Sequence, residues 1–192
     1  MSTQKITFKL TTFVSLILAP SLAFAHSGHE STAFSSGLIH PVTGVDHLIM
    51  LLAFGLLVGC ITATTTQKIV LLVSALTMLM VGLLVGSAFG LATGIEVAIV
   101  ASLFIVSAAI WQAFSASQKM IKLSLGLCVG MMFFHGYAHG VEVQGALGPF
   151  SLGMMVGASV LMALGTTIGH QVASRWISLG VAAVSALFLM AA

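Results

Sequence analysis

Apolar residues are gathered into long runs that are separated by short polar stretches. After the N-terminal region the runs cover residues 45–63, 68–90, 94–114, 119–140, 149–169 and 175–192. Each approaches the roughly 20 residues that an α-helix needs to cross a bilayer, and helices satisfy their backbone hydrogen bonds without water. The connections are short, so neighbouring helices should be antiparallel. We expect an all-α membrane protein: a bundle of six transmembrane helices without a soluble domain.

The N-terminus has the pattern of a cleaved secretory signal peptide. A basic start with two lysines precedes a short apolar stretch, and Ala23-Phe24-Ala25 has the small-residue pattern of a cleavage site. We predict a signal peptide over residues 1–25 and a single six-helix transmembrane domain over 26–192. The alternative is an uncleaved first membrane helix, which the shortness of the run and its interruption by Pro20 disfavour.

Charged residues are scarce and unevenly placed. They make up 5% of the chain, whereas soluble domains contain about 25%. Basic residues lie at the ends of helices that an exported N-terminus would place inside, and acids at the opposite ends. The basic residues are Lys68, Lys119, Lys122 and Arg175, and the acids are Glu30, Asp46, Glu96 and Glu142. By the positive-inside rule we expect a bacterial cytoplasmic (inner) membrane protein with both mature termini periplasmic.

Glycines and cysteines favour structural roles. Glycines spaced by four residues allow close approach of helices in lipid. They are Gly55/Gly59, Gly82/Gly86/Gly90, Gly126/Gly130, Gly153/Gly157 and Gly165/Gly169. The two cysteines, Cys60 and Cys128, lie inside apolar runs and are interpreted as small buried hydrophobic residues, not as a disulfide.

The first chemical motif is His40-Pro41-Val42-Thr43-Gly44-Val45-Asp46-His47, at the entrance to the first apolar run. Because His40 precedes a proline, we expect extended backbone there, with Asp46 and His47 starting the helix. The alternative is that Asp46 is only an N-cap and the histidines are interfacial.

The second motif, Phe134-His135-Gly136-Tyr137-Ala138-His139-Gly140-Val141-Glu142, ends the fourth run on the same side of the membrane. Two histidines four residues apart share a helical face and form a recurrent metal clamp, and Glu142 can lie on that face too. The alternative is an ordinary helix end, where histidine suits the dipole.

Together the motifs predict a site for a divalent transition metal. They could contribute His40, Asp46, His47, His135, His139 and Glu142, a donor set that suits Ni, Co, Zn or Cu(II). Three nearby methionines could also provide soft sulfur ligands for Cu(I). Packing between helices is the simpler role for them. They are Met50, Met131 and Met132.

Other histidines and acids are weaker candidates. Cleavage would leave His26 with a free amine beside its imidazole, so His26 and His29 could chelate metal, or form only a disordered tail. Glu96 and His170 are interpreted as helix-end residues in preference to ligands.

Several function classes lack any supporting motif. No nucleophile with a base, phosphate-binding loop or nucleotide fingerprint is visible, so we expect neither catalytic residues nor ATP hydrolysis. The net charge of +2 gives no basic patch for nucleic acid.

The two motifs, H-P-x2-G-x-D-H and F-H-G-x-A-H-G-x-E, resemble those of the HupE/UreJ family of nickel and cobalt permeases. The resemblance covers the whole chain. It implies uptake of Ni²⁺, sometimes Co²⁺, for assembly of a metalloenzyme such as hydrogenase or urease, with the six motif residues handling the metal. The chain departs from some members at Tyr137, where they have histidine.

We therefore expect a permease whose ligand is transported Ni²⁺ or Co²⁺ and which has no cofactor. Its expected partners are the metal ion and the lipid bilayer, with self-association into a homo-oligomer left open and no nucleic acid. The alternatives are a metal-binding membrane sensor or chaperone that does not conduct, and a metal-dependent membrane enzyme.

Overall fold

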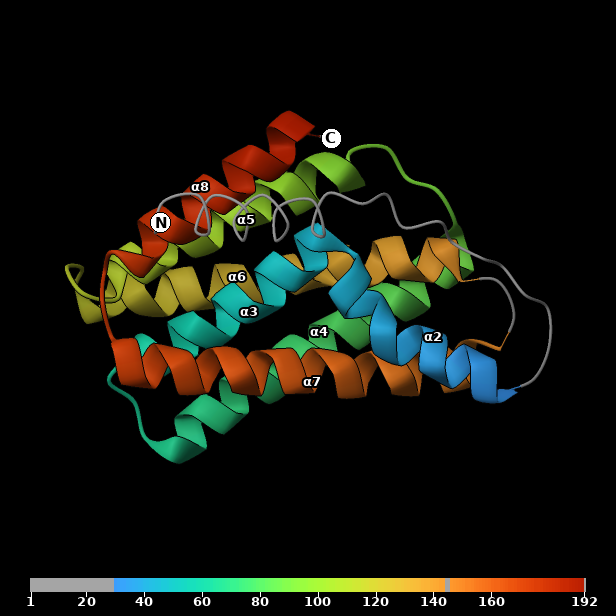
Figure 1. The fold of residues 1–192 in the computed structure, drawn as a ribbon, viewed down its shortest axis with the longest axis horizontal. Helices are drawn as coiled ribbons and strands as arrows, with labels where there is room; N and C mark the ends of the chain where they lie inside the picture. The colour runs from blue at the N-terminus through green and yellow to red at the C-terminus, as the bar shows by residue number, and fades with distance from the viewer. Residues whose placement is uncertain (1–29, 144–145, 192) are drawn as a thin grey trace, which may run out of the picture.

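The computed structural model describes residues 30–143 and 146–191, and within these ranges all regular structure is α-helical (Figure 1). The helices are α2 (Glu30–Thr43), α3 (Val45–Cys60), α4 (Thr65–Phe89), α5 (Ile95–Gln112), α6 (Gln118–Glu142), α7 (Leu147–Val172) and α8 (Ile177–Ala191). Each of the six apolar runs coincides with one helix, α3 to α8, and the all-helical prediction is confirmed. The predicted signal peptide and His26 lie outside the described residues.

Polar residues and glycines set the ends of the long helices. Thr64 and Gln67 form a reciprocal capping box at the start of α4, and the Ser117 side chain accepts a hydrogen bond from the Met120 amide at the start of α6. Gly90 and Gly94 have φ angles of 72° and 88°, a region that glycine enters without steric cost. They make the turn between α4 and α5.

Four helices, α4 to α7, are long and apolar enough to cross a membrane. The helix α3 is shorter, but it forms a pair with α2 that is bent by 76° at a short break and qualifies as one further span. The helix α8 has 15 residues, about 22 Å at 1.5 Å per residue, less than the ~30 Å hydrocarbon core. The described residues therefore contain four or five candidate spans, and the predicted six are not established.

The prediction that His40 is extended is wrong. His40 lies in the last turn of α2, followed by Pro41 inside the same helix. Pro41 has no N–H to donate to the preceding turn, but the His40 carbonyl still accepts from the Gly44 amide at 3.1 Å and the Thr43 hydroxyl at 3.0 Å, so hydrogen bonding continues past the proline. The break comes at Gly44, the extended N-cap of α3.

Both halves of the broken pair pack on α7, which runs beside them in Figure 1. A Cβ at Gly153 would overlap the Phe34 carbonyl of α2, and a Cβ at Gly165 would overlap the Leu52 carbonyl of α3. The helix α2 thus contacts the first half of α7 and α3 the second half. Because the contacts advance in the same direction along both, α2 and α3 follow α7 in the same chain direction.

A second glycine-packed group consists of α4 and α6. Gly136 and Gly140 of α6 lie directly against the Leu79 and Leu83 carbonyls of α4. The helix α5 contacts α3, α6 and α8 and so joins the two groups. Between the groups lies an apolar core with fully buried side chains such as Phe54.

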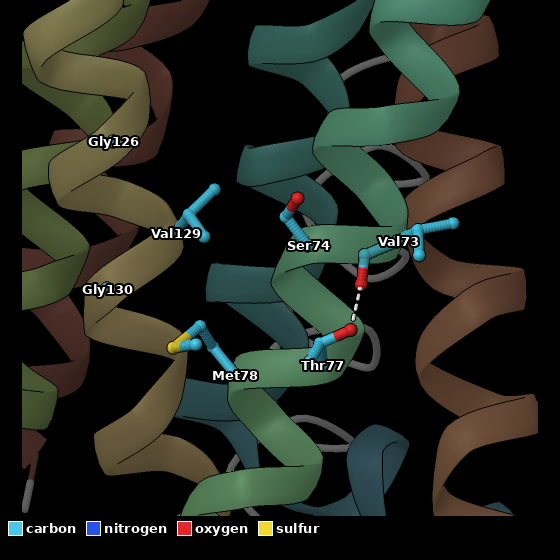
Figure 2. Close-up of a pocket in the computed structure, with 7 residues that line it drawn as sticks. All are labelled: Val73, Ser74, Thr77, Met78, Gly126, Val129 and Gly130. Carbon is cyan, nitrogen blue, oxygen red and sulfur yellow. Dashed lines mark hydrogen bonds between the residues drawn. The ribbon is translucent and has the colours of Figure 1, made fainter.

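One predicted glycine pair makes no such contact. Cβ atoms added to Gly126 and Gly130 would meet nothing within 4 Å among the described residues. They border a groove of about 340 Å³ between α4 and α6 (Figure 2). Its other lining residues are Val73, Ser74, Thr77, Met78 and Val129. The lining contains no titratable group, so this groove is not the metal centre.

Candidate metal centre

The break between α2 and α3 places one half of the site. His40 ends α2, and Asp46 and His47 lie in the first turn of α3. The Asp46 carboxylate Oδ1 is 2.9 Å from His47 Nδ1. A carboxylate on one ring nitrogen fixes the ring and leaves the other nitrogen, Nε2, as the available ligand atom.

The helix α6 places the other half. His135 and His139 are only 1% and 2% exposed and lie one turn apart on the same side of the helix. The glycines that follow them, Gly136 and Gly140, lie on an adjacent side against α4. The second motif therefore combines two functions: its glycines fix α6 on α4, and its histidines project into the bundle.

The two halves meet in a cluster of four imidazoles. The His47 ring centroid is 3.9 Å from that of His139 and 4.8 Å from that of His135, and His40 is 4.5 Å from His139. Ligand atoms within 4.8 Å of one another form two triads. We name them the outer triad, His40, His139 and Glu142, and the inner triad, Asp46, His47 and His135. All six motif residues are thus brought together.

The triads differ in access. In the outer triad, His40 Nε2 lies 3.5 Å from Glu142 Oε2, and these side chains are 31% and 65% exposed. The inner triad is more enclosed, with its His135 seven residues before the end of α6, or roughly 10 Å along the helix. The cluster therefore extends from an open mouth toward a closed interior.

Three buried nitrogens have no hydrogen-bond partner among the described residues: His47 Nε2, His135 Nδ1 and His139 Nδ1. An unpaired buried polar atom costs about 1–3 kcal/mol, and its persistence calls for an explanation. A metal ion bound to imidazole lone pairs provides one. The donor chemistry fits a divalent transition metal.

The Ser102 hydroxyl of α5 also contacts the cluster, 2.8 Å from His135 Nε2. Sequence reasoning missed it. The only signal was a serine inside an apolar helix, which is common in membranes, where serine usually bonds to backbone.

Two further candidates, Glu96 and His170, belong to neither triad. Glu96 is exposed in the first turn of α5, and His170 is exposed at the end of α7. Met50 and Met132 are buried in the apolar core and Met131 packs against it. His26 and His29 lie outside the described residues.

Tyr137 is directed elsewhere. Its hydroxyl donates to the Gly90 carbonyl at 2.7 Å, at the end of α4. The Tyr137 hydroxyl is therefore engaged at the end of α4 and not in the imidazole cluster.

These features define a helical membrane protein with a buried imidazole–carboxylate cluster between a broken helix and α6. The family model described as HupE / UreJ protein matches residues 14–191, and the chain belongs to this family. It is 28% identical over 137 residues to Protein HupE of Rhizobium leguminosarum bv. viciae, covering 70% of this chain and 68% of that protein. No solved structure matches the chain significantly.

Proposed function

We propose that the protein is a permease that takes up a divalent transition metal, Ni²⁺ or Co²⁺, through the two triads and without ATP hydrolysis. The observation that carries the proposal is the set of three unpartnered imidazole nitrogens from two helices, all buried. Membership in the HupE/UreJ family supports the same choice of cargo.

The arrangement of the triads supports a transport path that leads from the outer triad to the inner triad. The open outer triad is suited to capture the ion, and the enclosed inner triad to hold it after its water is removed. The contact between His139 and His47, whose ring centroids are 3.9 Å apart, links one triad to the other. Binding sites next to a broken helix are frequent in transporters.

The main rival is a membrane sensor or chaperone that binds metal without conducting it. It is favoured by the inner half of the bundle, where polar groups are few and engaged: the Thr166 hydroxyl donates to the Met162 carbonyl and the Cys60 thiol to the Gly169 carbonyl. A conducting protein must release the ion inward, so this half has to rearrange during transport.

Purified protein in liposomes that contain a metal-sensitive dye separates these functions. External Ni²⁺ or Co²⁺ should produce a signal that depends on the protein and needs no ATP. The matched control is His47→Gln, which should reconstitute equally and give only the background signal.

Tight metal binding with no entry into liposomes would favour the sensor or chaperone. A protein that neither binds nor transports either ion would contradict the proposal altogether. The membrane enzyme, in contrast, would require turnover of a substrate by the metal-loaded protein.

The proposal also includes the cellular location of the protein and the use of the metal inside the cell. The protein acts in the bacterial inner membrane, with His26 and His29 of the mature N-terminus raising local capture when metal is scarce. Inside the cell the metal would serve assembly of an enzyme such as hydrogenase or urease, as the family resemblance implies.

A further inference from the structure

The Ser102 hydroxyl has two close neighbours and a single proton. Its oxygen lies 2.6 Å from the Ile99 carbonyl oxygen on its own helix and 2.8 Å from His135 Nε2 on α6. Ser102 is fully buried and His135 is 1% exposed, so water cannot replace either contact.

The shorter contact fixes where the proton is. Two oxygens at 2.6 Å need a hydrogen between them, and the Ile99 carbonyl has none to give. The hydroxyl therefore donates to Ile99, and its oxygen can only accept from His135. It follows that His135 carries its proton on Nε2.

This tautomer leaves the lone pair of His135 on Nδ1. That atom is the one that is buried without a partner, in the histidine that belongs to the inner triad. The opposite tautomer would put a proton on Nδ1, where it would repel a cation.

In His47 the roles of the two ring nitrogens are exchanged. Its Nδ1 is held by the Asp46 carboxylate at 2.9 Å, and its Nε2 is the atom without a partner. Each of these two inner-triad histidines thus has one nitrogen fixed by a neighbour and the other left free. A hydrogen-bond partner of this kind orients a metal ligand and sets its tautomer.

We propose that Ser102 is a positioning residue of the inner triad: by accepting the Nε2 proton of His135, it keeps Nδ1 unprotonated and directed to the metal. The proposal rests on the proposed function in requiring that the triad binds metal. It assigns to α5, which contributes no ligand, a role in metal affinity.

The first test reads the tautomer in metal-free protein. In ¹⁵N-histidine-labelled protein at about pH 8, where an imidazole of ordinary pKa about 6.5 is neutral, the His135 signals are assigned by their absence in His135→Asn. We expect a proton on Nε2 of His135 and none on Nδ1. A proton on Nδ1 in the wild type would overturn the proposal.

The second test measures binding of Co²⁺ alone, by its visible absorption in competition with a chelator. Ser102→Ala should raise the Co²⁺ dissociation constant about 10- to 100-fold, the usual effect of losing a ligand's hydrogen-bond partner. Ser102→Thr keeps a hydroxyl that can bond back to the helix and should restore binding.

The matched control is Ser107→Ala. Ser107 is also buried on α5 and donates at 2.6 Å to a carbonyl, that of Ser178, but among the described residues its hydroxyl forms no hydrogen bond with a histidine. It should bind Co²⁺ as the wild type does.

Unchanged binding in Ser102→Ala, or an equal loss in Ser107→Ala, would overturn the positioning role. A wild-type protein that binds no Co²⁺ would contradict the proposed function instead. The tautomer measurement in metal-free protein would still test the role of Ser102.

Discussion

At the scale of single residues, histidines of one chain differ in role because their surroundings differ. His135 and His139 are buried with unpartnered nitrogens, His40 is partly exposed beside a carboxylate, and His170 is exposed at a helix end. Burial removes the water that would otherwise bind the ring, so the enclosed imidazoles keep lone pairs without a partner among the described residues, whereas His40 at the mouth stays open to water. Substitutions at these positions should therefore have different effects on uptake.

His139→Gln should abolish uptake and weaken metal binding by at least about 100-fold, since loss of even an outer hydrogen-bond partner costs 10- to 100-fold. The reason is that His139 contacts both His40 and His47 and so links the triads. His170→Gln is the matched control and should transport normally. Normal transport by His139→Gln, with normal insertion, would exclude the shared site.

His40→Ala should raise the metal concentration for half-maximal uptake while largely preserving the maximal rate. His40 lies at the exposed mouth, where Glu142 and His139 remain as capture ligands. Initial uptake rates across a range of Ni²⁺ concentrations measure both constants. A fall in maximal rate without a change in half-saturation would place His40 in the path itself.

Uptake should weaken as the outer solution is made more acidic. Metal binds only the neutral imidazole ring, so protons compete with the metal for the same lone pairs and acidification weakens metal binding. Liposome uptake at saturating and at limiting Ni²⁺ tests this. Rates that are equal at neutral and mildly acidic pH under limiting metal would show that imidazole binding is not rate-limiting.

At the scale of elements, the spacing of four residues serves two purposes on α6. One side presents His135 and His139, and an adjacent side presents Gly136 and Gly140 to the α4 backbone. Helix-to-helix contact at glycine fixes the height and rotation of α6, and these determine where the imidazoles meet α3. The packing of α4 on α6 is therefore part of the site.

Gly140→Ala should destabilise the protein by about 1–3 kcal/mol, the usual cost of overpacking, because the new Cβ would overlap the Leu83 carbonyl. It should also weaken metal binding through displacement of His139. Gly130→Ala, on the same helix but with nothing within 4 Å, is the control. Thermal unfolding in detergent compares the two; equal melting temperatures would contradict the role of the α4–α6 contact.

At the scale of the whole molecule, the candidate site lies between two glycine-packed groups. The broken pair α2–α3 with α7 supplies His40, Asp46 and His47, and the pair α4–α6 supplies the remaining ligands. A metal bound to either triad would tie the groups together. The rest of the interior is an apolar core that includes the buried side chains of Phe54 and Leu103.

A phosphatase reporter that is active only when exported should be active after Ala192 and inactive in the α5–α6 connection, residues 113–117. The expectation follows from the predicted signal peptide and from basic residues at one end of the bundle, with α8 as the expected last crossing. A cytoplasmic reporter at the same positions serves as the control and should give the reverse pattern. Activity of the cytoplasmic reporter after Ala192 would mean that α8 does not cross the membrane.

The sequence by itself determined the helical class, the positions of α3 to α8 and the identity of the six motif residues. Long apolar runs predict helices because backbone bonding in lipid is local, and rare ionisable residues in such runs indicate a site because their burial is costly. Both signals are local, so they can be read without knowing which helices touch.

Only the tertiary structure decided how the site is built. Packing of α2 on α7 keeps His40 helical although it precedes Pro41, against its local preference. The approach of α5 gives His135 the Ser102 hydroxyl, a contact between residues 33 positions apart. The bend of 76° and the division into two triads likewise depend on contacts between distant segments, which apolar periodicity does not encode.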